Sequence, residues 1–104
     1  FELKGTTNSE FHFILKARNG RTILSSETYQ SIFGAQNGIE SVKENANGDN
    51  PEEHFDVLKS SDGLFYFNML ANNNQVIGTS ETYTTKRNCL KGIQSVITNA
   101  KLLG

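Results

Sequence analysis

The sequence predicts an α+β fold built from two tandem β-β-β-α repeats, related by pseudo-twofold symmetry, with one antiparallel sheet and two helices on one face. The first observation is a duplication. Residues 1–46 and 55–100 align without a gap at an offset of 54 positions (55 minus 1), and 16 of the 46 pairs are identical. The second is a change of period in each copy, from alternating apolar residues to a spacing of three and four. Two units are too few for a solenoid, so we expect a closed pair.

The length of 104 residues predicts a single domain over 1–104, with repeat one at 1–46, a hydrophilic linker at 47–54 and repeat two at 55–100. Each half is close to the size at which a separate core is marginal, so the halves should share one core. The chain starts at Phe1 rather than Met, which we expect to reflect trimming or processing.

Three strands are expected in each repeat, beginning with short extended segments at residues 1–4 and 55–58. The second strand alternates, and its odd-numbered positions stay apolar in both copies, so they should face the core. These positions are Phe11, Phe13, Leu15, Ala17, Phe65, Phe67, Met69 and Ala71. The even-numbered positions change character between the copies and should lie on an open sheet face. They are His12, Ile14, Lys16, Tyr66, Asn68 and Leu70.

An Asn-Gly turn at residues 18–20 separates the second strand from the third. A two-residue turn would pair Leu15 with Leu24, whereas a three-residue loop closed by a left-handed glycine pairs Leu15 with Ile23. We prefer the second register because Ile23 is identical in repeat two. Asn74, which takes the place of the turn glycine, also tolerates left-handed angles. The register therefore predicts a positive φ at both turn positions.

A helix follows the third strand in each repeat. Ser31 and Thr85 are the expected N-caps, and residues 47–48 the expected stop of the first helix. The apolar stripes that should face the sheet are Ile32, Ala35, Ile39, Val42 and Ala46, then Cys89, Ile93, Val96 and Ala100. Gly38 and Gly92 interrupt the helices at equivalent places, each costing about 1 kcal/mol relative to alanine. We expect the helix backbone to approach the sheet closely there.

The sequence resembles a known family. The F-x-F strand, the Asn-Gly turn, Ser-Glu-x-Tyr and the helix reading Gly-Ile-x-Ser-Val-x-x-Asn-Ala are similar to the YegP-like family of small, mostly bacterial proteins with tandem copies of a domain of unknown function. The resemblance covers nearly the whole chain, with departures at Asn74 and residues 89–90. It implies two β3-α-β motifs with exchanged C-terminal strands, in which segments 54–58 and 101–104 complete the partner motif. It implies no established reaction.

Composition excludes several classes of function. The formal net charge is −1, from ten Lys and Arg against eleven Asp and Glu, without runs of one sign, which argues against nucleic-acid binding. No apolar run is long enough to span a bilayer, and we expect a cytoplasmic location. His12 and His54 occupy unrelated repeat positions, and Cys89 reads as a buried structural thiol. We therefore expect neither a metal nor a cofactor.

One candidate ligand site is the longest run identical in both copies: Ser26, Glu27, Thr28, Tyr29, Ser80, Glu81, Thr82 and Tyr83. Each block precedes a helix N-terminus, a place that favours anions. The alternative is structural: the hydroxyls bond the turn backbone and the tyrosine anchors the corner in the core. We assign no catalytic residue, because no His, Lys or second carboxylate recurs beside both blocks.

The sequence thus predicts a non-catalytic binding or interaction module. A protein partner that contacts the open sheet face or the edge strands is the preferred hypothesis, and the chain itself should be a monomer or a weak homodimer. The alternatives are a small-ligand or enzymatic site at the two Ser-Glu-Thr-Tyr corners and, third, weak single-stranded nucleic-acid binding. Because the identical positions mostly build the fold, we expect function where the repeats differ.

Overall fold

The computed structural model describes residues 1–103, and it confirms the β-β-β-α order of both repeats. The linker between them contains a short 3-10 helix that begins with the buried Pro51, and residues 47–50 before it are exposed. The elements are β1 (Glu2–Gly5), β2 (Phe11–Lys16), β3 (Thr22–Ser26), α1 (Ile32–Ala46), η1 (Pro51–His54), β4 (Phe55–Lys59), β5 (Phe65–Leu70), β6 (Val76–Thr79) and α2 (Lys86–Leu103).

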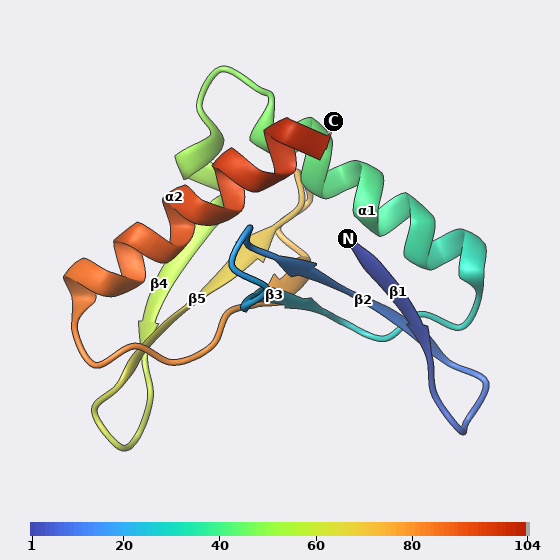
Figure 1. Ribbon diagram of the computed structural model, residues 1–104, viewed down its shortest axis with the longest axis horizontal. Helices are drawn as coiled ribbons and strands as arrows, with labels where there is room; N and C mark the ends of the chain where they lie inside the picture. The colour runs from blue at the N-terminus through green and yellow to red at the C-terminus, as the bar shows by residue number, and fades with distance from the viewer. Residues whose placement is uncertain (104) are drawn as a thin grey trace.

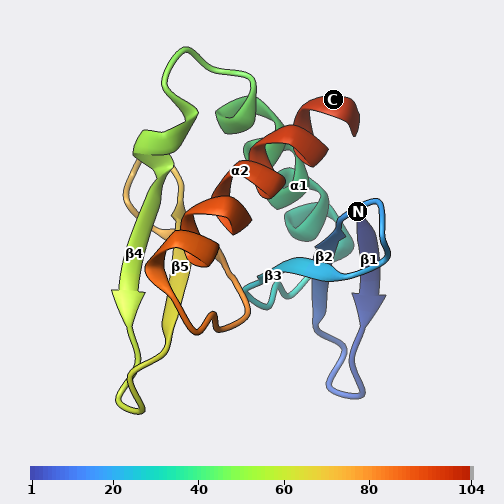
Figure 2. The same cartoon turned by 60° about the vertical axis from the view of Figure 1, so that its left-hand side comes forward.

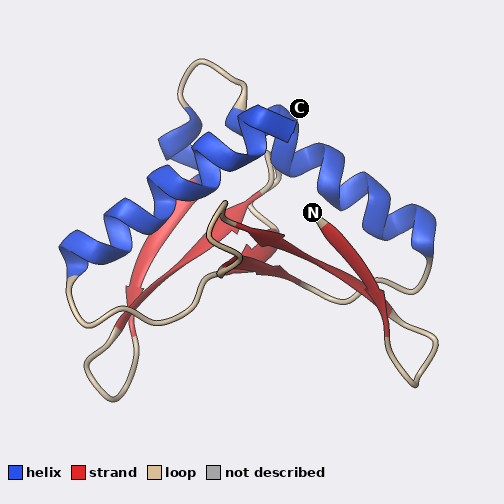
Figure 3. Ribbon diagram, in the orientation of Figure 1, coloured by secondary structure: helices blue, strands red, loops and turns tan. Residues whose placement is uncertain are grey.

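The six strands form one antiparallel sheet in the order β1-β2-β3-β6-β5-β4. The repeats meet at the centre, where Ser25 of β3 pairs with Thr79 of β6. Since these two positions are equivalent in the repeats, a pseudo-twofold axis passes between the two strands. Both helices lie on the same side of the sheet, and its two halves slope away from the centre on the other side (Figures 1 and 3). The uncovered face is therefore concave.

The strand exchange that the resemblance implied is present in one half only within the described part of the chain. Residues 55–59, which follow α1, form β4 and pair with β5 at the edge of the second repeat's half of the sheet. Residues 101–103 continue α2 instead of forming the reciprocal strand, and the buried stripe of α2 runs on to Ala100. Gly104 lies outside the described residues. The repeats also interlock through the second helix, since α2 contacts β2 and β3 as well as β4 and β5.

The bulged turn predicted between the second and third strands is confirmed. Gly20 has φ +84° and Asn74 has φ +67°, both in the left-handed region. The Ala17 amide donates to the Arg21 carbonyl at 2.9 Å, which closes a three-residue loop. Asparagine thus replaces glycine in the second copy without changing the turn, as its tolerance of left-handed angles allows.

The predicted pairing of Leu15 with Ile23 is wrong. Leu15 pairs with Leu24, while Lys16 pairs with Thr22, so a second irregularity leaves Ile23 as the extra residue. The same shift recurs between β5 and β6. A bulge puts two consecutive side chains on one face of the sheet, and both Ile23 and Leu24 are buried in the core.

The core lies between the sheet and the two helices and follows the predicted pattern. Phe13, Leu15, Phe67 and Met69 are fully buried, and so are most members of the two helical stripes. The prediction is wrong for Ile32, which is 48% exposed. Ile32 is the first residue of α1, and Cα–Cβ bonds tilt toward a helix N-terminus, so its side chain points past the end of the helix.

The junction of the repeats departs from twofold symmetry at one pair of equivalent positions. Leu24 is fully buried, whereas its counterpart in repeat two is Gly78. A Cβ added to Gly78 would lie 2.9 Å from the Ser25 carbonyl oxygen and 3.0 Å from Leu24 Cγ. The leucine of one repeat therefore occupies space that the glycine of the other leaves open.

Candidate ligand-binding grooves

The serines of the Ser-Glu-Thr-Tyr corners continue the sheet where the strand pairing stops. Ser26 Oγ accepts a hydrogen bond from the Phe13 amide at 2.8 Å and donates one to the next carbonyl at 2.8 Å. Ser80 does the same with the Phe67 amide, at 2.9 and 2.7 Å. Both hydroxyls are thus committed to the backbone, which is the structural role considered above.

The tyrosines anchor the corners. Tyr29 exchanges two backbone hydrogen bonds with Phe11, at 2.6 and 2.7 Å, and its ring stacks on Phe13 with a centroid separation of 6.2 Å. Tyr83 makes the same contacts in repeat two, with backbone distances of 2.6 and 2.8 Å and a ring separation of 6.4 Å. The corner geometry is therefore duplicated down to the ring orientation.

The glycines of the helices lie against these tyrosines. A Cβ on Gly38 would overlap the Tyr29 hydroxyl and lie 2.9 Å from Phe13 Cε2, and Gly92 meets Tyr83 in the same way. The predicted close approach is confirmed, with a correction: side chains of the corner and the strand approach the helix, not the sheet backbone. Each tyrosine ring is thereby held between a phenylalanine and a helix.

The tyrosine hydroxyls have no protein partner. Neither hydroxyl forms a hydrogen bond within residues 1–103, and every buried side-chain nitrogen or oxygen in this part has a partner, so both hydroxyls reach solvent. Burial of the ring raises the pKa of Tyr29, and Glu27 adds to the effect. Burial likewise raises the pKa of Tyr83, with a smaller contribution from Glu81. Both phenols therefore remain protonated donors at neutral pH.

Each tyrosine lines a surface groove to which both repeats contribute. The first groove, of about 410 Å³, lies between the N-terminal half of α2 and the β2–β3 hairpin. The second, of about 400 Å³, lies between α1 and the β5–β6 hairpin. Seven of the eleven lining positions in each are identical in the two repeats. In the first they are Ala17, Asn19, Ile23, Thr82, Tyr83, Gly92 and Ser95; in the second, Ala71, Asn73, Ile77, Glu27, Tyr29, Gly38 and Ser41.

The glutamates of the two corners have different surroundings. Arg21 donates from Nε to Glu81 Oε2 at 3.0 Å, an exposed contact that joins the hairpin of repeat one to the corner of repeat two. In the second groove Gln75 takes the place of Arg21, and Glu27 forms no ion pair within residues 1–103. The four-residue corners are thus not equivalent electrostatically, although their sequences are identical.

Only some residues of the predicted ligand site line the grooves. Thr82 and the tyrosines line the grooves, but Thr28 does not. The predicted N-caps are confirmed: Ser31 Oγ accepts from the Gly34 amide at 2.9 Å and Thr85 Oγ1 from the Asn88 amide at 3.1 Å. These caps occupy amides that an anion at a helix N-terminus would otherwise take.

Sequence reasoning missed the contribution of the other repeat to each groove. In the groove of Tyr83, Asn19 and Arg21 come from the hairpin of repeat one; Lys91 and Ser95, which were also missed, come from α2 of repeat two. Two identities between the repeats could have pointed to these residues: Asn19 with Asn73, and Ser95 with Ser41. None of these residues belongs to the predicted core, so packing does not account for their identity.

The open sheet face carries the six even-numbered residues, as predicted from the alternation, but one of them is not accessible. Ile14 is only 9% exposed. It pairs across the sheet with Glu2, whose carboxylate binds Lys16 Nζ at 2.9 Å, two positions along the same face. The ion pair between Glu2 and Lys16 thus lies beside Ile14 on this face. The hydrogen bond from Lys16 is also the main cause of the lowered pKa of Glu2.

The remainder of this face differs between the repeats. The half from repeat one is charged, whereas the half from repeat two presents Tyr66, Leu70 and the adjacent Leu58, which is 37% exposed. Asn68 in this half accepts from Thr79 Oγ1 at 2.8 Å. The β1–β2 and β4–β5 hairpins descend on opposite sides of the face (Figure 2).

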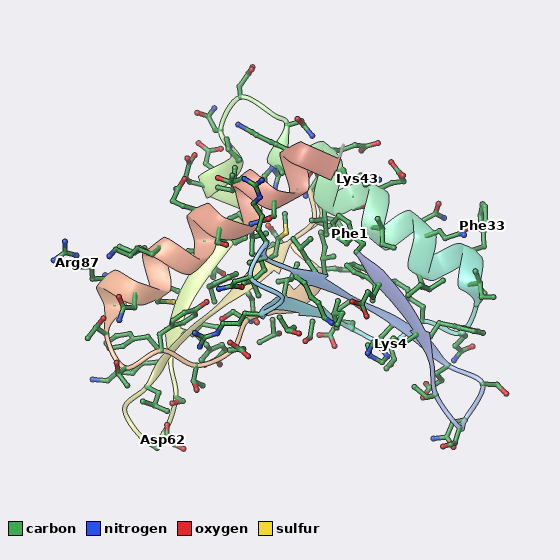
Figure 4. All side chains as sticks on the ribbon, in the orientation of Figure 1. Phe1, Lys4, Phe33, Lys43, Asp62 and Arg87 are labelled. Carbon is green, nitrogen blue, oxygen red and sulfur yellow. The ribbon has the colours of Figure 1, made fainter. Side chains whose placement is uncertain are left out.

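On the opposite side of the molecule, the helix surfaces also differ. Phe33 is 71% exposed near the start of α1, and the equivalent position of α2 is Arg87. Figure 4 shows both side chains projecting away from the sheet.

Within the described residues there is no group of three or more His, Cys, Asp or Glu side chains that could hold a metal ion. Over the same range, no helix is both long and apolar enough to cross a membrane.

A twofold arrangement of β-β-β-α units with helices on one face, and a groove at each junction of helix and hairpin, defines a class of small tandem-repeat α+β proteins. Each repeat matches the model of a domain of unknown function, DUF1508, at residues 7–53 and 60–102. The chain belongs to the UPF0339 family, which includes YegP, and this confirms the resemblance seen in the sequence.

Known relatives share the sequence and fold over nearly their whole length. UPF0339 protein YegP of Escherichia coli K12 is 44% identical over 99 residues, which cover 95% of this chain and 87% of that protein. The UPF0339 protein in the ptx operon 5' region of Stutzerimonas stutzeri is 43% identical over 100 residues, covering 96% and 87%. The solution NMR structure of the E. coli protein of unknown function yegP has a TM-score of 0.88 at 44% identity, covering 97% and 84%. That of Shewanella oneidensis SO3888 has a TM-score of 0.86 at 41% identity, covering 95% and 81%.

Proposed function

We propose that the chain is a non-catalytic binding module and that its two grooves are sites for small molecules. The main support is the enrichment of repeat identity in the grooves: seven of eleven lining positions are identical, against 16 of 46 in the whole alignment. Packing explains part of this, because the tyrosines and glycines hold the corner to the helix.

Packing does not explain all of it. Thr82 and Glu27 are exposed, Ser41 and Ser95 are only half-buried, and the tyrosine hydroxyls have no protein partner. Polar groups that converge on an apolar ring in a concave site are typical of small-molecule binding. The module is proposed as non-catalytic because the grooves bring no acid and base together at both corners.

A fragment screen by NMR on the ¹⁵N-labelled protein tests the proposal. We expect some fragments to shift amides of residues 17–23 and 82–95, or of 71–77 and 27–41. Ser95→Leu should fill the first groove and Ser41→Leu the second, so each variant serves as the control for the other. Fragments that bind elsewhere, or that are insensitive to both substitutions, would show that the grooves are not ligand sites.

A second candidate is protein contact through the open sheet face. It is supported by the absence of any covering element within residues 1–103 and by the half-exposed cluster of Leu58, Tyr66 and Leu70. Changing these three residues to Ser and comparing affinity capture from a native extract with an Ile32→Ser, Leu90→Ser control tests it. A partner retained by the sheet-face variant contradicts contact through this face.

A further inference from the structure

We infer that the first groove, between α2 and the β2–β3 hairpin, selects a small molecule that carries a phosphate or carboxylate group, and that the second groove does not. The inference rests on the proposed function and adds the class of ligand. It starts from the four lining positions in each groove that differ between the repeats, because six of the other seven line both grooves with the same residue.

Two of these differences change the charge. Arg21 and Lys91 line the first groove, and Gln75 and Asn37 take their places in the second. Counting Glu81, which binds Arg21, the first groove has two cations and one anion. The second has the carboxylate of Glu27 and no cation among its lining residues. An oxyanion would be attracted to the first groove and repelled from the second.

The contact with Glu81 leaves Arg21 able to bind a ligand. A guanidinium has five N–H donors, and the hydrogen bond to Glu81 is made by Nε at 3.0 Å. No other side-chain hydrogen bond of Arg21 occurs within the described residues, so both terminal nitrogens remain available. Glu81 therefore fixes the direction of the guanidinium and leaves its two terminal nitrogens, which can bind a carboxylate or phosphate through two parallel hydrogen bonds.

Further donors surround this cation. Lys91 forms no ion pair within residues 1–103, and the protonated Tyr83 hydroxyl reaches solvent in the same groove. The apolar part of a ligand would meet Ala17 and Ile23. The start of a helix borders both grooves and is capped by a hydroxyl in both, so the difference between the grooves lies in the side chains. The site thus suits an oxyanion attached to a compact apolar or aromatic group.

The chain supplies its own matched variants. Arg21→Gln with Lys91→Asn gives the first groove the residues of the second, and Gln75→Arg with Asn37→Lys does the reverse. NMR titrations at constant ionic strength would use inorganic phosphate, benzoate and benzamide, the last being a neutral analogue of benzoate. Phosphate and benzoate separate phosphoryl from carboxylate recognition.

We expect saturable shifts with phosphate or benzoate at residues 17–23 and 82–95 of the natural protein, and weaker binding of benzamide. The first double variant should lose at least roughly tenfold in affinity, as expected when one charged hydrogen bond is removed. The reverse double variant should gain binding at residues 71–77 and 27–41. Because the exchanged residues are exposed, the fold should persist, which the unchanged spectrum elsewhere would verify.

Three results would overturn the inference. Equal binding of benzoate and benzamide, or anion binding that persists after Arg21→Gln with Lys91→Asn, would show that charge does not select the ligand while leaving the grooves as binding sites. Absence of saturable binding of either anion to the natural protein would refute the anion site directly. The fragment screen described above then decides separately whether the grooves bind any small molecule.

Discussion

Replacing Gly38 by alanine should destabilise the protein, although alanine is the better helix former. In an unconstrained helix interior the change would stabilise by about 1 kcal/mol. Here the new Cβ would overlap the Tyr29 hydroxyl and lie 2.8 Å from Tyr29 Cζ and 2.9 Å from Phe13 Cε2. The stacked ring of Tyr29 cannot move freely between Phe13 and α1. Overpacking of this kind costs about 1–3 kcal/mol, and because the contacts with Tyr29 and Phe13 are so short we expect the upper part of this range and a net loss of up to about 2 kcal/mol.

Gly34→Ala is the control on the same helix. Its Cβ would lie 3.3 Å from Ser31 Oγ and 3.5 Å from Tyr29 Cδ1, contacts that need little adjustment, so we expect a gain of up to about 1 kcal/mol. Urea unfolding followed by circular dichroism would measure the free energy of unfolding of both variants, and in thermal unfolding their melting temperatures should differ by roughly 10 °C. Tyr29→Phe should restore part of the loss in Gly38→Ala. If Gly38→Ala is as stabilising as Gly34→Ala, the close approach of the tyrosine does not require this glycine.

The other predictions concern the repeat junction, the turn and the buried thiol. Gly78→Ala should cost about 2 kcal/mol in urea unfolding, since its Cβ would lie 2.9 Å from the rigid Ser25 carbonyl; a neutral change contradicts this packing. Asn74→Gly should stabilise the protein by about 0.5 kcal/mol because φ is +67°, and Gly20→Asn should destabilise it by a similar amount. If neither variant changes the urea midpoint, asparagine is not strained at this turn. Burial raises the pKa of Cys89 above its ordinary 9.0, so the native state favours the protonated thiol and stability should fall as the pH rises above that value. Replacing Cys89 by alanine, the residue that repeat one has at this position, should reduce this loss of stability with rising pH. If the pH dependence of stability does not change, the thiol is not its cause.

Most of the fold could be predicted because two independent copies constrain each position. Alternation placed Phe13 and Phe67 in the core, and the helical spacing located both helices and their caps. The strand register failed at Ile23 because a bulge changes the face of a residue without changing the local composition. The exposed Ile32 was missed because periodicity does not show where a helix ends relative to the sheet.

The candidate site was harder to predict, because its parts come from different repeats. Repeat identity marked the corner of each unit, but it could not indicate that Tyr83 lies beside the hairpin of the other unit. That arrangement depends on the central β3–β6 pairing, which no residue pattern specifies. The expectation that function lies where the repeats differ stays a prediction, and the grooves contain differing residues such as Arg21 beside identical ones.

The unequal pair at the repeat junction gives the two halves of the chain a preference for each other. In a symmetric dimer of one half, each residue on the axis meets its own copy. Two copies of repeat one would place a pair of leucines where Leu24 now needs the open space of Gly78, and two copies of repeat two would leave that space empty. Covalent fusion thus permits a knob and a hole to evolve at what would otherwise be self-complementary positions. Heterologous pairing of the two halves then disfavours the pairing of like halves from two molecules, and it allows the two grooves to diverge in sequence.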